Sequence, residues 1–163
     1  MPARAADLAE IDTFCDALWL EDGLAKATLD SYRSDLGRLA LWLADNAGEP
    51  LLDLRETALT AFIAHLSRQT RASSQARYLS TLRRFYRWQL ARGRIVADPT
   101  LKLANPTRPS RLPKVMSEKQ VDRLLAAPDL DTPLGLRDRA MLETLYATGL
   151  RASELVNLKI HEV

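Results

Sequence analysis

The segment "LDSYRSDLGRLALWL", residues Leu29–Leu43, decides the fold class. Its large apolar side chains recur at alternating spacings of three and four residues, which keeps them on one face of an α-helix. These side chains are Leu29, Tyr32, Leu36, Leu39 and Leu43. The spacing predicts a long amphipathic helix that turns one apolar stripe toward a core.

The same period continues on both sides of this segment. It predicts helices over about 7–20 and 55–68, and a fourth helix that follows "RASSQ" (71–75) and ends at Gly93. Ser73 or Ser74 can cap the first turn of that fourth helix, and Gly93 suits the position just after its end. We find no strand pattern and no repeat. The chain as given is therefore predicted to be all-α, with a four-helix bundle of about a hundred residues at its N-terminal end.

The composition is that of a soluble globular protein, with 163 residues of which 47% are hydrophobic and 27% charged. No apolar run approaches the ~18 to 20 residues that cross a bilayer, and the N-terminus lacks the apolar stretch of a signal peptide. We therefore expect a cytoplasmic protein without a membrane partner. The single cysteine, Cys15, falls on an apolar helical stripe, so we expect a buried structural thiol, and no metal site or cofactor is predicted.

Charge is distributed unevenly along the chain. Residues 1–70 carry a net charge of −6, residues 71–115 a net charge of +10, and residues 116–163 a net charge of −2. A segment as basic as the middle one, following an acidic one, indicates a polyanionic partner.

The fourth predicted helix separates its apolar side chains from its basic ones. Its polar face is predicted to contain Ser73, Arg77, Ser80, Thr81, Arg84 and Arg87. Guanidinium groups and small hydroxyls on a helix can contact phosphates and guanine edges in a major groove, so this face is predicted to bind duplex DNA. A solvated polar face remains the alternative. Trp88 lies on the same side, and we expect it to pack against a neighbouring helix rather than to stack on a base.

After the bundle the sequence loses its helical period. The stretch "ADPTLKLANPTRPSRLPK" (97–114) holds four prolines among basic residues, and we interpret residues 106–116 as a linker between domains at 1–105 and 117–163. The linker adds Arg108, Arg111 and Lys114 to the predicted DNA contacts.

Helical signals resume after the linker. Ser117 and Gln120 form a capping-box pattern, and the pair Thr132–Pro133 predicts the start of a further helix that ends at Gly149. Residues 117–163 are too few to bury a convincing core alone.

One arginine follows that helix-ending glycine, in "ATGLRASEL" (147–155). Arg151 is predicted at the start of a short helix, where unpaired backbone N–H groups and a two-pronged guanidinium favour a phosphate. Glu154 can hold that guanidinium by an i,i+3 contact. From the spacing alone, a surface ion pair at a helix start is the favoured interpretation.

These segments resemble the tyrosine recombinases of the phage integrase family. "LRDRAMLETLYATGLRASELVNL" (136–158) is similar to the family's first catalytic box, and "FCDALWLEDGLAKATLDSYRSDLGRLALWL" (14–43) to the start of its core-binding domain. "SSQARYLSTLRRFYRWQL" (73–90) resembles the groove-facing helix of that domain, and 98–125 resembles the interdomain linker. The form "YATGLR" is similar to the bacterial XerC/XerD type, and "DALWLE" (16–21) with "LYATGLR" (145–151) favours the XerD side.

The resemblance implies a SAM-like core-binding bundle followed by the first helices of a mixed α+β catalytic domain. It also implies site-specific strand exchange through a 3′-phosphotyrosine intermediate, without a metal ion or an external energy source. Arg151 matches the first catalytic arginine, and Glu154 matches the acidic residue that supports it. The implied partners are a double-stranded recombination site, a second, XerC-type recombinase in a heterotetramer on DNA, and an FtsK-type DNA translocase, in chromosome dimer resolution.

The family pattern continues beyond Arg151 with a lysine, a His-x-x-Arg box and the nucleophilic tyrosine, and none of these follows here. "HLSR" (65–68) matches the second box by letters only, because it lies upstream in a predicted bundle helix. We therefore expect a fragment of a recombinase that binds DNA without cutting it. Two rival interpretations stay open: a non-enzymatic helical DNA-binding protein or shortened recombinase paralogue, and an interaction bundle whose basic stretch meets an acidic protein.

Overall fold

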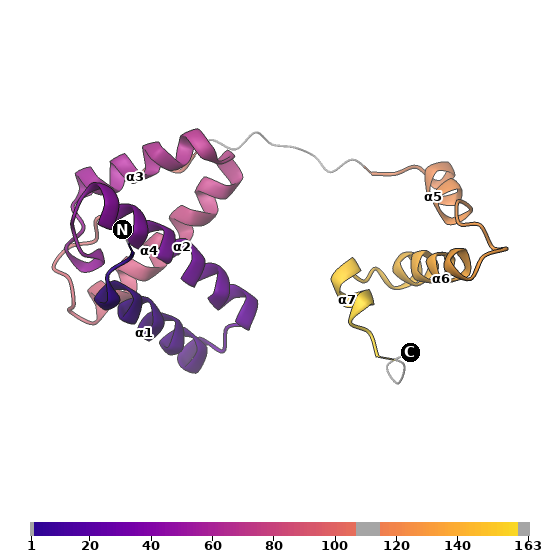
Figure 1. The fold of residues 1–163 in the computed structure, drawn as a ribbon, viewed down its shortest axis with the longest axis horizontal. Coiled ribbons are helices and arrows are strands. Elements are labelled where there is room, and N and C mark those ends of the chain that lie inside the picture. The colour runs from indigo at the N-terminus through magenta and orange to yellow at the C-terminus, as the bar shows by residue number, and fades with distance from the viewer. Residues whose placement is uncertain (1, 107–114, 160–163) are drawn as a thin grey trace. The chain divides into compact units, whose positions relative to one another are not determined.

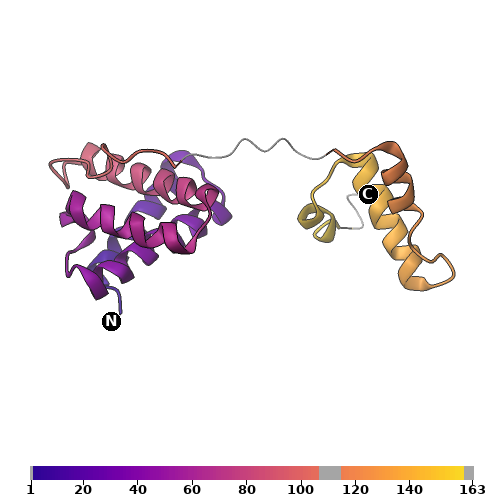
Figure 2. The same cartoon turned by 90° about the horizontal axis from the view of Figure 1, so that it is seen from above.

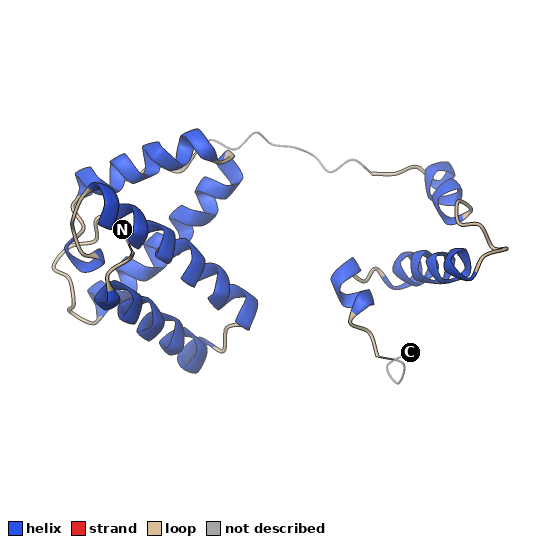
Figure 3. Ribbon diagram, viewed as in Figure 1, coloured by secondary structure: helices blue, strands red, loops and turns tan. Residues whose placement is uncertain are grey.

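The computed structural model describes residues 2–106 and 115–159, and the chain divides into two compact units, Met1–Pro109 and Ser110–Val163. In the described residues all regular structure is helical and no strand occurs (Figure 3). The all-α prediction is confirmed. The exact boundaries at 105 and 117 stay a prediction, and each unit is considered separately below.

The described residues of unit 1 form four α-helices and one short 3-10 turn. The helices are α1 (Ala5–Asp22), α2 (Lys26–Asn46), α3 (Glu56–Gln69) and α4 (Ala72–Ala91), and the turn η1 spans Leu51–Asp53. Helix α2 is central, because it contacts each of α1, α3, α4 and η1 (Figures 1 and 2). The four predicted helices are therefore present and form the predicted bundle.

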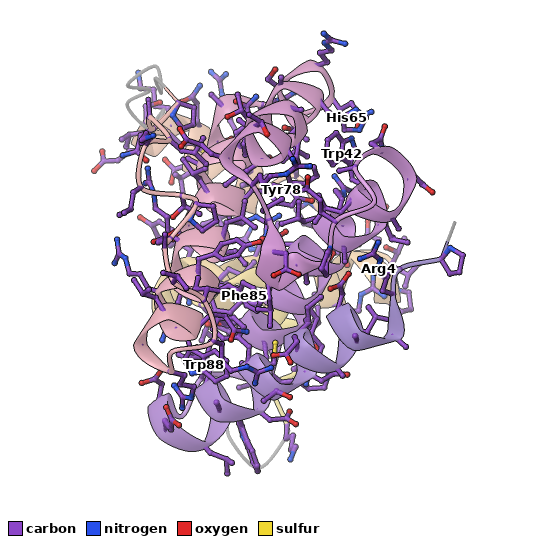
Figure 4. The ribbon with its side chains drawn as sticks, turned by 90° about the vertical axis from the view of Figure 1, so that its left-hand side faces the viewer. Arg4, Trp42, His65, Tyr78, Phe85 and Trp88 are labelled. Atoms are coloured by element: carbon purple, nitrogen blue, oxygen red, sulfur yellow. The ribbon has the colours of Figure 1, made fainter. Side chains whose placement is uncertain are left out.

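Aromatic side chains join the helices of unit 1 in one core. The Phe14 ring of α1 lies 5.2 Å from the Phe85 ring of α4, edge to face, and 5.4 Å from the Trp88 ring. Figure 4 shows Phe85 and Trp88 within the body of unit 1. Trp88 thus packs against a neighbouring helix as expected. Cys15 is fully buried, so the prediction of a buried thiol is also confirmed.

The start of α4 differs from the sequence prediction. Helix α4 begins at Ala72 with Arg71 as its N-cap, and no side chain caps it, so the proposed capping by Ser73 or Ser74 is wrong. The reason is that the first intrahelical bond already runs from the Gln75 N–H to the Arg71 carbonyl, which places both serines inside the helix.

The end of α4 follows the prediction. Gly93 has φ +67°, and the N–H groups of Gly93 and Arg94 donate to the carbonyls of Leu90 and Gln89, both at 3.0 Å. This pair of bonds is a Schellman motif, which needs a left-handed residue after the helix. It turns the chain back toward the bundle.

Unit 2 contains α5 (Glu118–Leu125), α6 (Pro133–Thr148) and α7 (Ala152–Val156). The Ser117 N–H donates to Gln120 Oε1 at 2.9 Å, which completes the predicted capping box. The Thr132 hydroxyl accepts from the Gly135 N–H at 3.0 Å, and Gly149 ends α6 with φ +69°. The predicted starts of α5 and α6 and the predicted end of α6 are therefore confirmed.

The described part of unit 2 buries no large apolar side chain completely. Leu134, Leu136 and Tyr146 are 63%, 56% and 66% exposed. This agrees with the expectation that residues 117–163 do not make a core alone. Among the described residues of either unit, no helix is both long and apolar enough to cross a membrane.

Candidate nucleic-acid interface

The exposed side of α4 borders a hollow of about 800 Å³ in unit 1. Its lining consists of Ala76, Ser80, Arg83, Arg84, Arg87, Asn105 and Pro106, and we call it the arginine hollow. Three guanidinium groups line it, and no carboxylate of the described residues does. The hollow therefore favours an anion, and its volume exceeds what a single side chain fills.

Arg83 is the residue of the hollow that the sequence analysis missed. Its guanidinium donates to the Asn105 side-chain oxygen and to the Leu103 carbonyl, both at 2.6 Å. These bonds fix the segment after α4 along the helix and so form one wall of the hollow. The sequence analysis left Arg83 out of the polar face, and helical projection cannot include a wall made by residues about twenty positions later.

Arg84 and Arg87 differ in how far they are neutralised. The Arg84 guanidinium donates to Asp22 at 2.8 Å and lies 5.9 Å from the centre of the Tyr32 ring. Arg87 is exposed and makes no ion pair, side-chain hydrogen bond or ring contact with any described residue. Arg87 is therefore the most available cation of the hollow, and Ser80 is an exposed hydroxyl beside it.

Arg77 and Thr81 lie outside the hollow and contact an acid of the core. The Thr81 side chain is buried, with the residue 1% exposed, and its hydroxyl donates to Asp35 at 2.9 Å. The prediction that Thr81 lies on the exposed face is wrong, because the helix packs that edge against α2. Arg77 also donates to Asp35 but keeps 52% of its side chain exposed.

The remaining predicted contacts are dispersed or undescribed. Ser73 is exposed in the first turn of α4 but does not line the hollow. Arg108, Arg111 and Lys114 lie outside the described residues. The structure thus brings together Ser80, Arg84 and Arg87 of the predicted set, adds Arg83, and removes Thr81.

Acidic residues of α1 neutralise part of the basic segment. Arg92 pairs with Glu21, Arg94 pairs with Glu10, and Arg84 pairs with Asp22 as described above. The negative net charge of residues 1–70 therefore lies in part against the positive charge of residues 71–115. The +10 net charge of the basic segment overstates the charge that unit 1 presents to a partner.

Unit 2 carries the second candidate site at the start of α7. The Arg151 backbone N–H and guanidinium donate to the two oxygens of Glu154, each at 2.8 Å. These bonds hold the pKa of the Glu154 carboxyl below its usual value. The predicted i,i+3 contact is confirmed, whereas the catalytic role stays a prediction. With 81% of its side chain exposed, Arg151 can reach a ligand from this anchored position.

Other candidate chemistry is absent from the described residues. His65 of the "HLSR" string is exposed on α3, with its ring 6.2 Å from the Trp42 ring, in a unit separate from Arg151. No group of three or more histidine, cysteine or acidic side chains in the described ranges is arranged to hold a metal ion.

Two family patterns match the two units. Residues 11–93 match the phage integrase N-terminal SAM-like domain, and residues 114–163 match the phage integrase family. The chain belongs to the phage integrase family, an enzyme family of tyrosine recombinases. The resemblance inferred from the sequence is therefore confirmed.

Among its relatives are proteins named tyrosine recombinase XerD. The chain is 47% identical to that of Ralstonia nicotianae over 163 residues, covering all of this chain and 53% of the relative. It is 51% identical to that of Xanthomonas axonopodis pv. citri over 156 residues and to that of Pseudomonas aeruginosa over 154 residues, covering 95% and 94% of this chain and 51% of each relative. The chain thus spans about half the length of these relatives.

Proposed function

We propose that this chain is the DNA-binding portion of a site-specific recombinase that exchanges strands through a 3′-phosphotyrosine intermediate. Unit 1 binds one half of a duplex recombination site, and α4 with the arginine hollow faces the DNA. Unit 2 supplies Arg151 to the scissile phosphate.

The observation that carries this proposal is the arginine hollow. Phosphate contacts dominate the affinity of proteins for duplex DNA, and guanidinium groups make them in bidentate form. Arg83, Arg84 and Arg87 line one concave surface without an acid among them. The segment after α4 folds back along the helix and is held there by Arg83, so the three arginines border a concave surface rather than a flat one.

Arg151 acts in this proposal on the transition state. Negative charge grows on the non-bridging oxygens as a nucleophile attacks the phosphorus, and a guanidinium in contact with them stabilises that charge. One bond to Glu154 is made by the Arg151 backbone N–H and the other by one guanidinium N–H, and the rest of the guanidinium stays exposed to a ligand. Glu154 is then a positioning residue for Arg151.

The 163 residues are proposed to bind DNA without cutting it. Tyr78 and Tyr86 are buried, and Tyr32 packs against Phe14 with the ring centres 6.1 Å apart. These three side chains are held in the bundle and do not serve as nucleophiles. Tyr146 is exposed on α6, but it precedes Arg151, whereas the family pattern places the nucleophilic tyrosine after that arginine.

The proposed setting is chromosome dimer resolution in the cytoplasm. The partners are a second, XerC-type recombinase in a heterotetramer on the DNA and an FtsK-type DNA translocase. This part of the proposal rests on the relatives named XerD and on family membership.

A footprint tests the proposal. The 163-residue chain is incubated with duplexes selected from a randomised pool, and protection from hydroxyl radicals is mapped on both strands. The proposal expects protection of one continuous half-site and no covalent adduct. Uniform weak protection, or binding to acidic polypeptides in preference to duplex, would favour the interaction-bundle interpretation instead.

A further inference from the structure

An acidic side chain lies buried beneath the exposed arginines of α4. Asp35, in the middle of α2, is 0% exposed as a residue. One carboxylate oxygen accepts from both the Arg77 guanidinium and the Thr81 hydroxyl, whereas the other has no hydrogen-bond partner among the described residues. A buried carboxylate with one unpaired oxygen destabilises a fold, so a bundle selected for stability alone would favour an apolar residue here.

Asp35 restrains the direction of the Arg77 side chain. One N–H group of the guanidinium donates to the carboxylate, and the guanidinium lies 5.0 Å from the centre of the Tyr78 ring. Tyr78 is itself 4% exposed, so the ring is a fixed support. Arg77 nevertheless keeps about half of its side chain in solvent. Its free N–H groups therefore leave the bundle in one orientation.

A fixed orientation matters for reading a base and little for holding a phosphate. The common arginine contact to guanine uses two parallel bonds to O6 and N7, which a freely rotating side chain makes only at an entropic penalty. A phosphate accepts a cation from many directions. The carboxylate also reduces the positive charge that Arg77 presents to the backbone. Arg87, exposed and without a described partner, is the opposite case.

We propose that Asp35 is a specificity-determining positioning residue that orients Arg77 to read a base edge in duplex DNA. This inference rests on the proposed DNA-binding function. It predicts that Arg77 carries sequence preference, while the arginine hollow supplies affinity that does not depend on sequence.

The test is selection of duplexes from a randomised pool by the 163-residue chain, followed by sequencing of the bound fraction. Wild type is compared with Asp35→Asn, Arg77→Ala and the double variant. Arg77→Ala should abolish preference at one or two adjacent positions. Asp35→Asn should weaken preference by about tenfold at those same positions and leave the others unchanged. The double variant should resemble Arg77→Ala alone.

Asp98→Asn is the matched control. Asp98 is also buried, at 6% exposure, and it accepts from the Thr100 N–H at 2.8 Å and hydroxyl at 2.7 Å rather than from an arginine. The substitution makes the same charge change and removes the same kind of buried group. Asp98→Asn should leave the base preference at every position of the selected duplexes unchanged. Thermal unfolding is recorded for each variant, so that all are compared in the folded state.

Three results would overturn the inference. Unchanged preference in Asp35→Asn would show that Arg77 needs no support, and an equal loss at all positions would assign Asp35 to stability alone. If Asp35→Asn does not fold, Arg77→Lys replaces it, because lysine keeps the charge without the planar fork; retained preference in Arg77→Lys would overturn the inference equally. Failure of wild type to bind any duplex would instead remove the proposed function on which it rests.

Discussion

Replacement of Arg87 by alanine is the sharpest test of the arginine hollow. Arg87 lines the hollow, is exposed, and has no ion pair with any described residue, so its whole charge is available to a phosphate. Each phosphate contact contributes ~0.9 to the log–log dependence of duplex affinity on salt concentration. Arg87→Ala should therefore lower that slope by about 0.9.

The loss of affinity follows from the same relation. If Arg87→Ala and wild type bind duplex equally at 1 M salt, a slope difference of ~0.9 makes the variant bind about fivefold more weakly at 0.15 M salt. This loss corresponds to ~1 kcal/mol. The assay is fluorescence anisotropy of a labelled duplex titrated at several salt concentrations. Arg84→Ala should have a smaller effect, because Arg84 gives up its bond to Asp22 when it turns to a phosphate. Asp22→Asn should correspondingly tighten binding.

Arg68→Ala on α3 is the matched control, because Arg68 is exposed but does not line the hollow. It should change the slope much less than Arg87→Ala does. An unchanged slope in Arg87→Ala, or an equal fall in both variants, would refute the assignment of phosphate contacts to the hollow.

Three further predictions concern groups outside the hollow. Arg77→Ala should lower the free energy of unfolding by about 1–3 kcal/mol, because it leaves the buried Asp35 without its cation, and Asp35→Asn in the same chain should restore part of that loss in urea unfolding. Burial raises the pKa of the Cys15 thiol from 9.0 to about 11, so the unfolded chain loses this proton first as the pH rises. The free energy of unfolding should therefore fall by ~0.8 kcal/mol between pH 8 and pH 9.5. Cys15→Ala should remove this pH dependence when both proteins are unfolded in urea at the two pH values. Arg151→Ala should leave duplex affinity within about twofold, since its guanidinium stabilises mainly the charge that grows in the transition state, yet in a complete recombinase it should slow covalent adduct formation by about 10²-fold or more in single-turnover assays. Adduct formation at the wild-type rate in Arg151→Ala would mean that Arg151 only begins a helix and takes no part in catalysis.

The helices of unit 1 were predictable because their signals are local. The apolar spacing of Leu29–Leu43 sets one buried stripe, and that spacing survives in α2, where Leu36, Leu39 and Leu43 are fully buried. The end of α4 was predictable for the same reason, because Gly93 has a conformational freedom that its neighbours lack. The start of α4 was not predictable, because a serine at the N-cap and a serine inside the first turn give the same sequence pattern.

The candidate site was predictable only in part, because it depends on contacts between distant segments. Arg84 and Arg87 follow from helical projection, but the pairing of Arg84 with Asp22 crosses from α4 to α1. The position of Asp35 did carry a signal, because an acid three residues after Tyr32 and four before Leu39 falls on the apolar stripe. Its partner could not be inferred without the packing of α2 against α4.

The most direct test of the central claim is cleavage of DNA from a reagent tethered in the hollow. Ser80→Cys is modified with an iron chelate that generates hydroxyl radicals, while the buried Cys15 remains unlabelled. Thr13→Cys on α1 is the control, because Thr13 is exposed but does not line the hollow. The account predicts cleavage at a short cluster of positions on a selected duplex from residue 80 and none from residue 13. Equal cleavage from both positions, or from residue 13 alone, would contradict it.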